Sequence, residues 1–446
     1  MQEACPIPRP ADTLHEQFAA MSLVKTSLLN GVAVAIKLIT SLVLNKVLAV
    51  YLGPAGYAII GQFQNLIAMV GAVASGAVNT GVTKYTAEYH SDPERQRGLW
   101  RTAAMLSLVG GLIVSAALLL CRKPLARWAF ADETLSGVIV WLAAALLLLL
   151  LLNALLLAIL SGIKAVRAFV VANIAGSLVS AVVAMTLVLW GGLYGALVAL
   201  AVSQALACGV TACLFRRNCD VQWRALIGRI DTTVARKLGG FAVMSISSAL
   251  LVPSSQLLIR DGLVNQLGWQ AAGLWQALGR ISDTHLLLIT TTLSLHFLPR
   301  FSEIRSAEEL SEEVRKGFRF VVPLVSASAL CIYLARQPLI SALLSPKFLP
   351  LVDVIGWQLI GDVLKVSSWI LGFALISHAM TKQVVITEFI FSALLVGLSL
   401  IGARFDGLRG VSMGYAATYA LYGLTVMFIF KTQLLPRLPS RYELST

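Results

Sequence analysis

The sequence predicts an all-α, polytopic membrane protein with twelve transmembrane helices arranged in two six-helix lobes. Three observations carry this prediction: long apolar stretches fill the chain, lysine and arginine are unevenly distributed between the loops, and the second half repeats the first. Hydrophobic residues make up 58% of the 446 residues and charged residues only 13%. With a mean hydropathy of +0.81, this composition excludes an ordinary soluble domain.

Each apolar stretch is long enough to cross a bilayer as a helix. About 20 apolar residues span the hydrocarbon core, which is about 30 Å thick, and a helix satisfies its backbone polar groups without water. The stretch 136–160 shows this most plainly, because leucines cover all of its faces. The predicted helices are 22–50, 58–82, 99–121, 136–160, 166–190, 193–215, 237–259, 270–298, 317–335, 352–378, 383–403 and 408–430.

The loops predict the orientation. Those after the even-numbered helices carry 18 lysines and arginines, and those on the opposite side carry 8. Because basic loops stay in the cytoplasm, we expect both termini to lie there. The same basic loops account for the net charge of +13, so this charge does not indicate nucleic-acid binding. The predicted parts are a cytoplasmic tail 1–21, an N-lobe 22–215, a basic connector 216–236, a C-lobe 237–431 and a cytoplasmic tail 432–446.

The two halves match at an offset of about 216 residues. The segment Gly192–Gly195 matches Gly407–Gly410 at an offset of 215, and Arg122–Leu125 matches Arg336–Leu339 at 214. Each match is weak, but their agreement in chain order indicates an internal duplication. Six helices return the chain to its starting side, so the copies are expected to be parallel repeats about an axis along the membrane normal.

Several charged residues lie at membrane depth, where each costs about 2.5–3.5 kcal/mol if it faces lipid. We therefore expect them to face a hydrated cavity or one another. These residues are Lys37, Arg280, Asp283, Asp362, Lys365 and Glu388, with Lys46 and Arg260 nearer the helix ends. Polar stripes on the same apolar helices include Asn30, Gln62, Asn65 and Gln276. They predict a central cavity shared by both lobes, with more cations than unpaired acids and hence an anionic substrate such as a phosphate ester.

Other interpretations of these charges stay open. Arg280 with Asp283, and Asp362 with Lys365, are opposite charges three residues apart and could simply neutralise each other. Glu388 could face the lipid headgroups, and Lys46 could extend to the outer interface. The histidines, His285 among them, are scattered along the chain and are interpreted as structural.

Motifs for catalysis are not found in the sequence. It shows no nucleophile–base pair, no metal-ligand spacing and no phosphate-binding glycine loop. We therefore expect a protein that is not an enzyme and that has no metal or cofactor.

Short motifs along the chain from Met21 onward resemble a known family. They are Tyr51–Gly56, Gly81–Tyr85 with Glu88-Tyr89, Ile281–Asp283, Phe297–Pro299, and Lys347-Phe348 followed by Trp357–Lys365. These segments resemble Wzx-type flippases, polysaccharide transporters of the MATE-like multidrug/oligosaccharidyl-lipid/polysaccharide exporter superfamily. The similarity is greatest to translocases for enterobacterial common antigen and O-antigen.

The resemblance implies a two-lobe carrier in the bacterial inner membrane. Such carriers move an undecaprenyl-diphosphate-linked oligosaccharide to the periplasmic leaflet by alternating access, with the polysaccharide polymerase and chain-length regulator as possible partners. It implies diphosphate or glycan contacts for Lys37, Lys46, Arg260 and Arg280, and gating or coupling roles for Asp283, Asp362 and Lys365. Independently of the resemblance, an acid at membrane depth near cations is a candidate proton carrier, which makes Glu388 a candidate coupling residue. The alternatives are an ion-coupled drug exporter of the same superfamily, a flippase for lipid-linked peptidoglycan precursors, and a structural protein of cell-wall assembly.

Overall fold

We describe a computed structural model of the chain, which covers residues 10–76, 78–218, 226, 228–378 and 380–439. Side chains in several parts of these ranges, including 10–30 and 240–248, are left out of the description. The described residues are almost entirely helical, as the long apolar stretches predict. In the first half the elements are α1 (Pro10–Ser75), α2 (Asn79–Glu88), α3 (Pro93–Leu120), α4 (Arg122–Phe130), η1 (Glu133–Leu135), α5 (Ser136–Ala145), η2 (Leu146–Leu150), α6 (Leu151–Gly162) and α7 (Val166–Asn218).

The second half follows the same plan. Its elements are α8 (Thr232–Glu303), α9 (Ala307–Leu334), α10 (Arg336–Leu343), η4 (Pro346–Asp353), α11 (Ile355–Ser377), α12 (Thr381–Ile429), η5 (Phe430–Leu434) and η6 (Leu435–Arg437). Helix α1 begins at Pro10, so it extends into the segment 1–21 that we predicted as a tail. Residues 1–9 and most of the connector's centre lie outside the described part.

Six of the described helices are long and apolar enough to cross a membrane. They are α1, α3, α7, α9, α11 and α12. Helices α1, α7, α8 and α12 are each divided by a glycine with positive φ, a conformation that glycine adopts without a steric penalty. These glycines are Gly53, Gly192, Gly268 and Gly407, and each falls at a predicted junction between two apolar stretches. The chain is therefore a multi-pass membrane protein, and the count of twelve crossings stays a prediction.

Equivalent breaks in the two halves have similar backbone geometry. Gly53 has φ 65° and ψ −173°, and Gly268 has φ 80° and ψ 171°. Gly192 and Gly407 pair in the same way, with φ 52° and ψ −128° against φ 54° and ψ −137°. Helices α3 and α9 both have 28 residues and begin with capping side chains, Asp92 and Ser306, that accept backbone N–H bonds. These correspondences are those expected of a duplicated unit.

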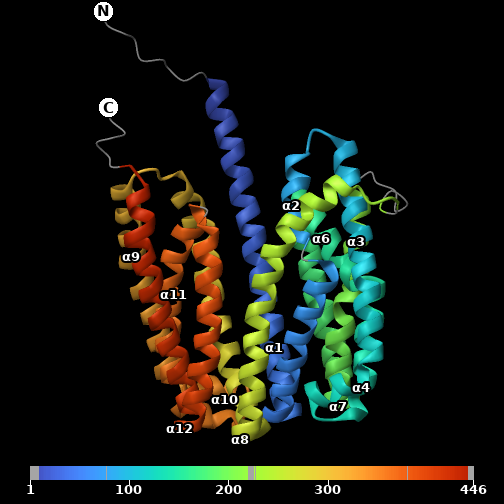
Figure 1. The fold of residues 1–446 in the computed structure, drawn as a ribbon, viewed down its shortest axis with the longest axis vertical. Coiled ribbons are helices and arrows are strands. Elements are labelled where there is room, and N and C mark those ends of the chain that lie inside the picture. The colour runs from blue at the N-terminus through green and yellow to red at the C-terminus, as the bar shows by residue number, and fades with distance from the viewer. Residues whose placement is uncertain (1–9, 77, 219–225, 227, 379, 440–446) are drawn as a thin grey trace, which may run out of the picture.

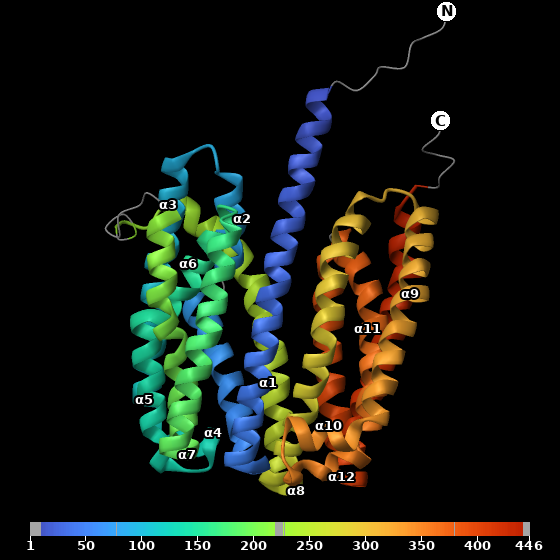
Figure 2. The same ribbon diagram turned by 180° about the vertical axis from the view of Figure 1, so that it is seen from behind.

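The two halves form two helical bundles that stand side by side (Figures 1 and 2). The first arm of α1 runs between them, and α1 packs along α8. The beginning of α1 and the end of the described chain lie at one end of the molecule, here called the upper end, whereas α4 and α10 lie at the lower end (Figure 1). One hydrophobic cluster joins both bundles there, with Leu48 and Tyr57 from α1 packed with Ile340 and Phe348 from the second half.

Candidate functional site

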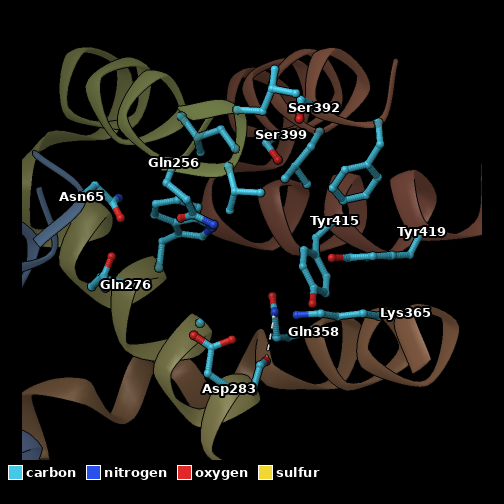
Figure 3. A pocket seen from close by; sticks show the side chains of 18 of the residues that line it. Asn65, Gln256, Gln276, Asp283, Gln358, Lys365, Ser392, Ser399, Tyr415 and Tyr419 are labelled. Carbon is cyan, nitrogen blue, oxygen red and sulfur yellow. Dashed lines mark hydrogen bonds between the residues drawn. The ribbon is translucent and has the colours of Figure 1, made fainter. Parts of the chain in front are cut away.

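A cavity of about 620 Å³ lies mainly within the second bundle. Helices α8, α11 and α12 supply most of its wall, and Gln64 and Asn65 of α1 complete it from the first bundle. The polar lining is rich in amides, and the aromatic lining includes Trp275, Trp369, Tyr415, Tyr419 and Tyr422. In Figure 3, Lys365 and Gln358 extend from α11 toward Tyr415 in the middle of the site. We predicted a central cavity shared by both lobes. Residues of both halves line the observed cavity, and most of them belong to the C-lobe.

Arg280 joins the two bundles at the edge of this cavity. Its guanidinium donates a hydrogen bond to the side-chain oxygen of Gln64 in α1. The two residues are 216 positions apart, which is the offset of the sequence repeat. The breaks of the same two helices, Gly53 and Gly268, are 215 positions apart, so Gln64 and Arg280 lie within one residue of equivalent places. Contact between such places is expected near the axis that relates the copies.

Arg260 lies behind the cavity wall and is fully buried, with 0% of its surface exposed. It donates to the side-chain oxygen of Gln62 at 3.4 Å and to that of Gln276, and it lies 5.5 Å from the ring of Trp275. Its Nε has no hydrogen-bond partner. In this conformation Arg260 therefore holds the wall together through neutral amides and does not line the cavity.

Asp362 is also fully buried, at 0% exposure. The hydroxyl of Tyr415 donates to Asp362 Oδ1 at 2.9 Å, and Nδ1 of His285 lies 3.7 Å from Oδ2. The ammonium of Lys365 instead lies over the rings of Trp369 and Tyr419, at 5.3 and 5.8 Å from their centroids. Among the salt bridges of the described residues, none joins Asp362 to Lys365, although their spacing places both on one helix face.

The lower end is closed by direct contacts between the bundles. Lys46 Nζ donates to the carbonyl oxygen of Ser341 at 2.9 Å, and Ser345 Oγ donates to that of Ala49 at 3.4 Å. The rings of Tyr57 and Phe348 meet edge to face at 5.7 Å. Lys46, expected from the resemblance to contact substrate, is in this state part of the contact between the bundles.

The predicted site residues thus fall into four groups. The cavity is lined by Asn65, Gln276, Arg280, Asp283, Lys365 and Glu388. The wall behind it contains Gln62, Arg260 and Asp362. Lys46 lies at the lower contact, and Lys37 is exposed on α1 outside the lining. The side chain of Asn30 lies outside the described residues.

The charge balance of the lining differs from the sequence-based expectation. Arg280 and Lys365 are matched by Asp283 and Glu388, so the lining shows no excess of cations. Gln64 and the aromatic residues of the wall were not predicted from the sequence. His285, interpreted as structural, lies beside Asp362. The spacing of Tyr415, Tyr419 and Tyr422 places them on one face of α12, a signal that could have revealed the aromatic wall.

The described residues contain no cluster of three histidine, cysteine, aspartate or glutamate side chains that could hold a metal ion.

A family of polysaccharide biosynthesis proteins matches residues 47–353. This chain belongs to that family. The resemblance to Wzx-type flippases is confirmed by this match and by a relative, the lipid III flippase of Escherichia coli K12. That relative is 31% identical over 404 residues, which cover 90% of this chain and 96% of its own length.

Solved structures of transporters share the fold of this polysaccharide biosynthesis protein. An inward-facing multidrug resistance MATE transporter of the MOP superfamily superimposes with a TM-score of 0.74 at 16% identity, over 89% of this chain and 94% of its own. The outward-facing conformation of a MATE transporter gives 0.68 at 16% identity, over 92% and 95%. A MOP superfamily transporter from Pyrococcus furiosus, described as having a binding pocket of reverse polarity, gives 0.66 at 15% identity, over 92% and 95%. At these identities the likeness establishes the MATE-like fold, and the relatives are transporters rather than catalytic enzymes.

Proposed function

We propose that this protein is a flippase that moves an undecaprenyl-diphosphate-linked oligosaccharide from the cytoplasmic to the periplasmic leaflet of the bacterial inner membrane. The observation that carries the proposal is the cavity inside the C-lobe, which combines cations, amides and aromatic rings at membrane depth. Its glycan would be an O-antigen or enterobacterial common antigen repeat unit, handed on to a polymerase and a chain-length regulator.

The lining suits the two polar parts of such a substrate. Arg280 offers several N–H donors to a diphosphate, and Lys365 adds a second cation. Trp275 and Trp369 offer flat apolar surfaces to sugar rings, and amides such as Gln256 can exchange hydrogen bonds with sugar hydroxyls. A fully hydrophobic wall would bind the lipid alone, so the mixture favours a glycolipid head group.

The shape of the molecule supports alternating access by two six-helix lobes. If each glycine-broken helix crosses the membrane twice and the α5–α6 segment crosses once, the described elements supply twelve crossings. The basic loops then place the upper end in the cytoplasm. The contacts of Lys46 and Tyr57 close the lower, periplasmic end, so the conformation is the inward-facing one.

A drug exporter of the same superfamily is the second candidate. It is favoured by the acids Asp283 and Glu388 in the lining, because carboxylates attract organic cations. The lipid III flippase relative favours a lipid-linked substrate over a drug, and a lipid-linked peptidoglycan precursor remains the alternative within that class.

Transport by the purified protein in proteoliposomes tests the proposal. A fluorescent undecaprenyl-diphosphate oligosaccharide should become accessible to an external glycan-modifying enzyme at a rate that depends on the protein. Arg280→Gln should slow this transport by at least about tenfold, since a hydrogen bond to a charged group contributes about 1.5–3 kcal/mol. Arg305→Gln, at an exposed position in the α8–α9 turn, is the matched control. Export of organic cations without glycolipid movement would instead support the drug exporter.

A further inference from the structure

A second, smaller pocket lies between the lobes, beside the transport cavity. Its volume is about 190 Å³, and α1, α8, α9 and α10 supply its wall. Helix α10 lies next to α8 at the lower end (Figure 2), and Leu344 of the wall directly precedes Ser345 of the lower contact. Most of the lining is apolar and consists of Leu42, Ile281, Ile332, Leu339, Leu343 and Leu344.

The polar side chains around this pocket are mostly bonded to other protein atoms. Tyr57 Oη donates to Asn45 Oδ1 at 3.0 Å, and Thr284 Oγ1 donates to the backbone carbonyl oxygen of Arg280 at 2.7 Å. His285 is the exception, because neither of its ring nitrogens has a hydrogen-bond partner. An apolar cavity of about 150 Å³ stays dry and binds benzene. A pocket of this size and lining therefore suits a hydrocarbon group better than water or a sugar.

Arg280 connects this pocket to the transport cavity. Among the described residues it is the one that lines both spaces. Its guanidinium has five N–H donors, so the hydrogen bond to Gln64 leaves donors for a ligand. A polar space and an apolar space thus meet at a cation. A lipid-linked sugar diphosphate has the same order of parts, because its diphosphate lies between the glycan and the hydrocarbon chain.

On α1 the wall of the pocket continues into the apolar outer surface of the protein. Ile39 and Val43 are three positions and one position from Leu42, so they lie within about 100° of it around the helix. Their side chains are 61% and 45% exposed. A chain bound in the pocket can therefore continue along α1 into the lipid without crossing a polar surface.

We infer that this pocket binds the first isoprene units of the substrate's lipid chain, while Arg280 binds the diphosphate and the large cavity holds the glycan. An isoprene unit has five carbon atoms, one fewer than benzene, so a pocket of about 190 Å³ holds about one or two such units. The inference rests on the proposed function for the glycan. The chain site itself can be tested with a probe that carries no sugar.

The test uses the full-length protein in phosphatidylcholine nanodiscs and geranyl diphosphate with a photoreactive diazirine on its second isoprene unit. After irradiation, mass spectrometry of the peptides identifies the residues to which the probe is attached. We expect adducts on the pocket residues of α1, α9 or α10. Their yield should be at least about tenfold above that of the same diazirine on geraniol, because the diphosphate gains hydrogen bonds to a charged group. Arg280→Gln should lower the yield to the level of the geraniol probe.

Two results with these probes would overturn the chain site. One is a spread of adducts over the lipid-facing helices, or equal pocket yields with and without the diphosphate. The other is an equal pocket yield from phosphatidylglycerol with the diazirine in an acyl chain, which would assign the pocket to an ordinary phospholipid.

Ile332→Phe and Leu42→Phe fill the pocket from α9 and from α1. Each should lower the adduct yield at least about fivefold, because the larger side chain and an isoprene unit compete for the same space. The matched control is Leu334→Phe on α9, at a side chain that is 71% exposed and outside the lining. It should keep the parent yield. Parent yields in both filling variants would overturn the chain site.

Closure of the lower contact is measured in the same variants. Ser345→Cys, in a background without the six native cysteines, places a thiol at the contact, where Ser345 is 6% exposed. A membrane-impermeant reagent labels this thiol faster when the contact opens. We expect the labelling rate of the parent in Ile332→Phe and in Leu42→Phe. A loss of adducts only in variants that also label faster would overturn the chain site, because opening of the contact would then explain the loss.

Failure of the chain site and failure of the proposed function give different results. Transport of the fluorescent glycolipid together with adducts outside the pocket would refute the chain site alone. Adducts of geranyl diphosphate in the pocket of a parent protein that moves no glycolipid would refute the proposed function and leave the chain site standing.

Discussion

At Gly273 the backbone of α8 lies close to the backbone of α1. A Cβ atom added there would collide with the backbone carbonyl oxygen of Pro54 in α1. Because a backbone atom cannot swing aside, Gly273→Ala should force α1 and α8 apart and weaken the closed lower contact. Overpacking typically destabilises by 1–3 kcal/mol, and alanine recovers about 1 kcal/mol of helix propensity. At the middle of this range the net loss is about 1 kcal/mol, which would shift the equilibrium toward the open contact about fivefold.

Labelling of Ser345→Cys measures this shift directly. The matched control is Gly279→Ala in the same helix, because a Cβ at Gly279 would meet nothing within 4 Å. We expect labelling to accelerate in Gly273→Ala and to stay at the parent rate in Gly279→Ala. Equal rates in the two variants would show that the approach of Gly273 to Pro54 does not control the contact, and the reasoning would fail.

Three further predictions concern other parts of the molecule. Lys46→Met should speed labelling of Ser345→Cys several-fold, because a hydrogen bond to a charged group contributes about 1.5–3 kcal/mol, whereas Lys46→Arg should keep most of the closure. The exchange Asp362→Lys with Lys365→Asp should abolish glycolipid transport at normal expression, because the aspartate would lose the Tyr415 hydroxyl; wild-type transport would show that the two charges only neutralise each other. A cysteine replacing Arg229, which is exposed near the connector's end, should react with reagents added to the cytoplasmic side, and periplasmic labelling would contradict the predicted orientation.

The breaks in the fold could be predicted because short-range chemistry determines them. The matched segments around Gly192 and Gly407 predicted two equivalent junctions between helices. Both glycines have the same backbone conformation with positive φ. Apolar length and the basic loops are likewise local signals. The start of α1 could not be predicted in this way, since the polar residues after Pro10 are compatible with either a tail or a helix.

The site was predicted less completely, because its interactions depend on side-chain direction and on distant partners. Sequence spacing placed Asp362 beside Lys365, yet Asp362 bonds to Tyr415 on α12, and Lys365 lies over aromatic rings. Arg260 was expected to contact substrate, but its partner Gln62 lies 198 positions away, and no local pattern reveals that contact. The net charge of a cavity likewise depends on which residues line it, and spacing along single helices does not determine this.

The contact between Gln64 and Arg280 shows that the two similar halves differ in charge where they meet. Two nearly equivalent positions meet near the expected axis, where Gln64 carries a neutral acceptor and Arg280 a charged donor. If both carried glutamine, the amides could still bond to each other, so the lobes would keep a polar contact at this point. Arg280→Gln therefore removes the charge while it preserves a hydrogen-bonding pair. Loss of transport with unchanged labelling of Ser345→Cys would assign the function of Arg280 to its charge, and faster labelling would assign it to holding the two lobes together.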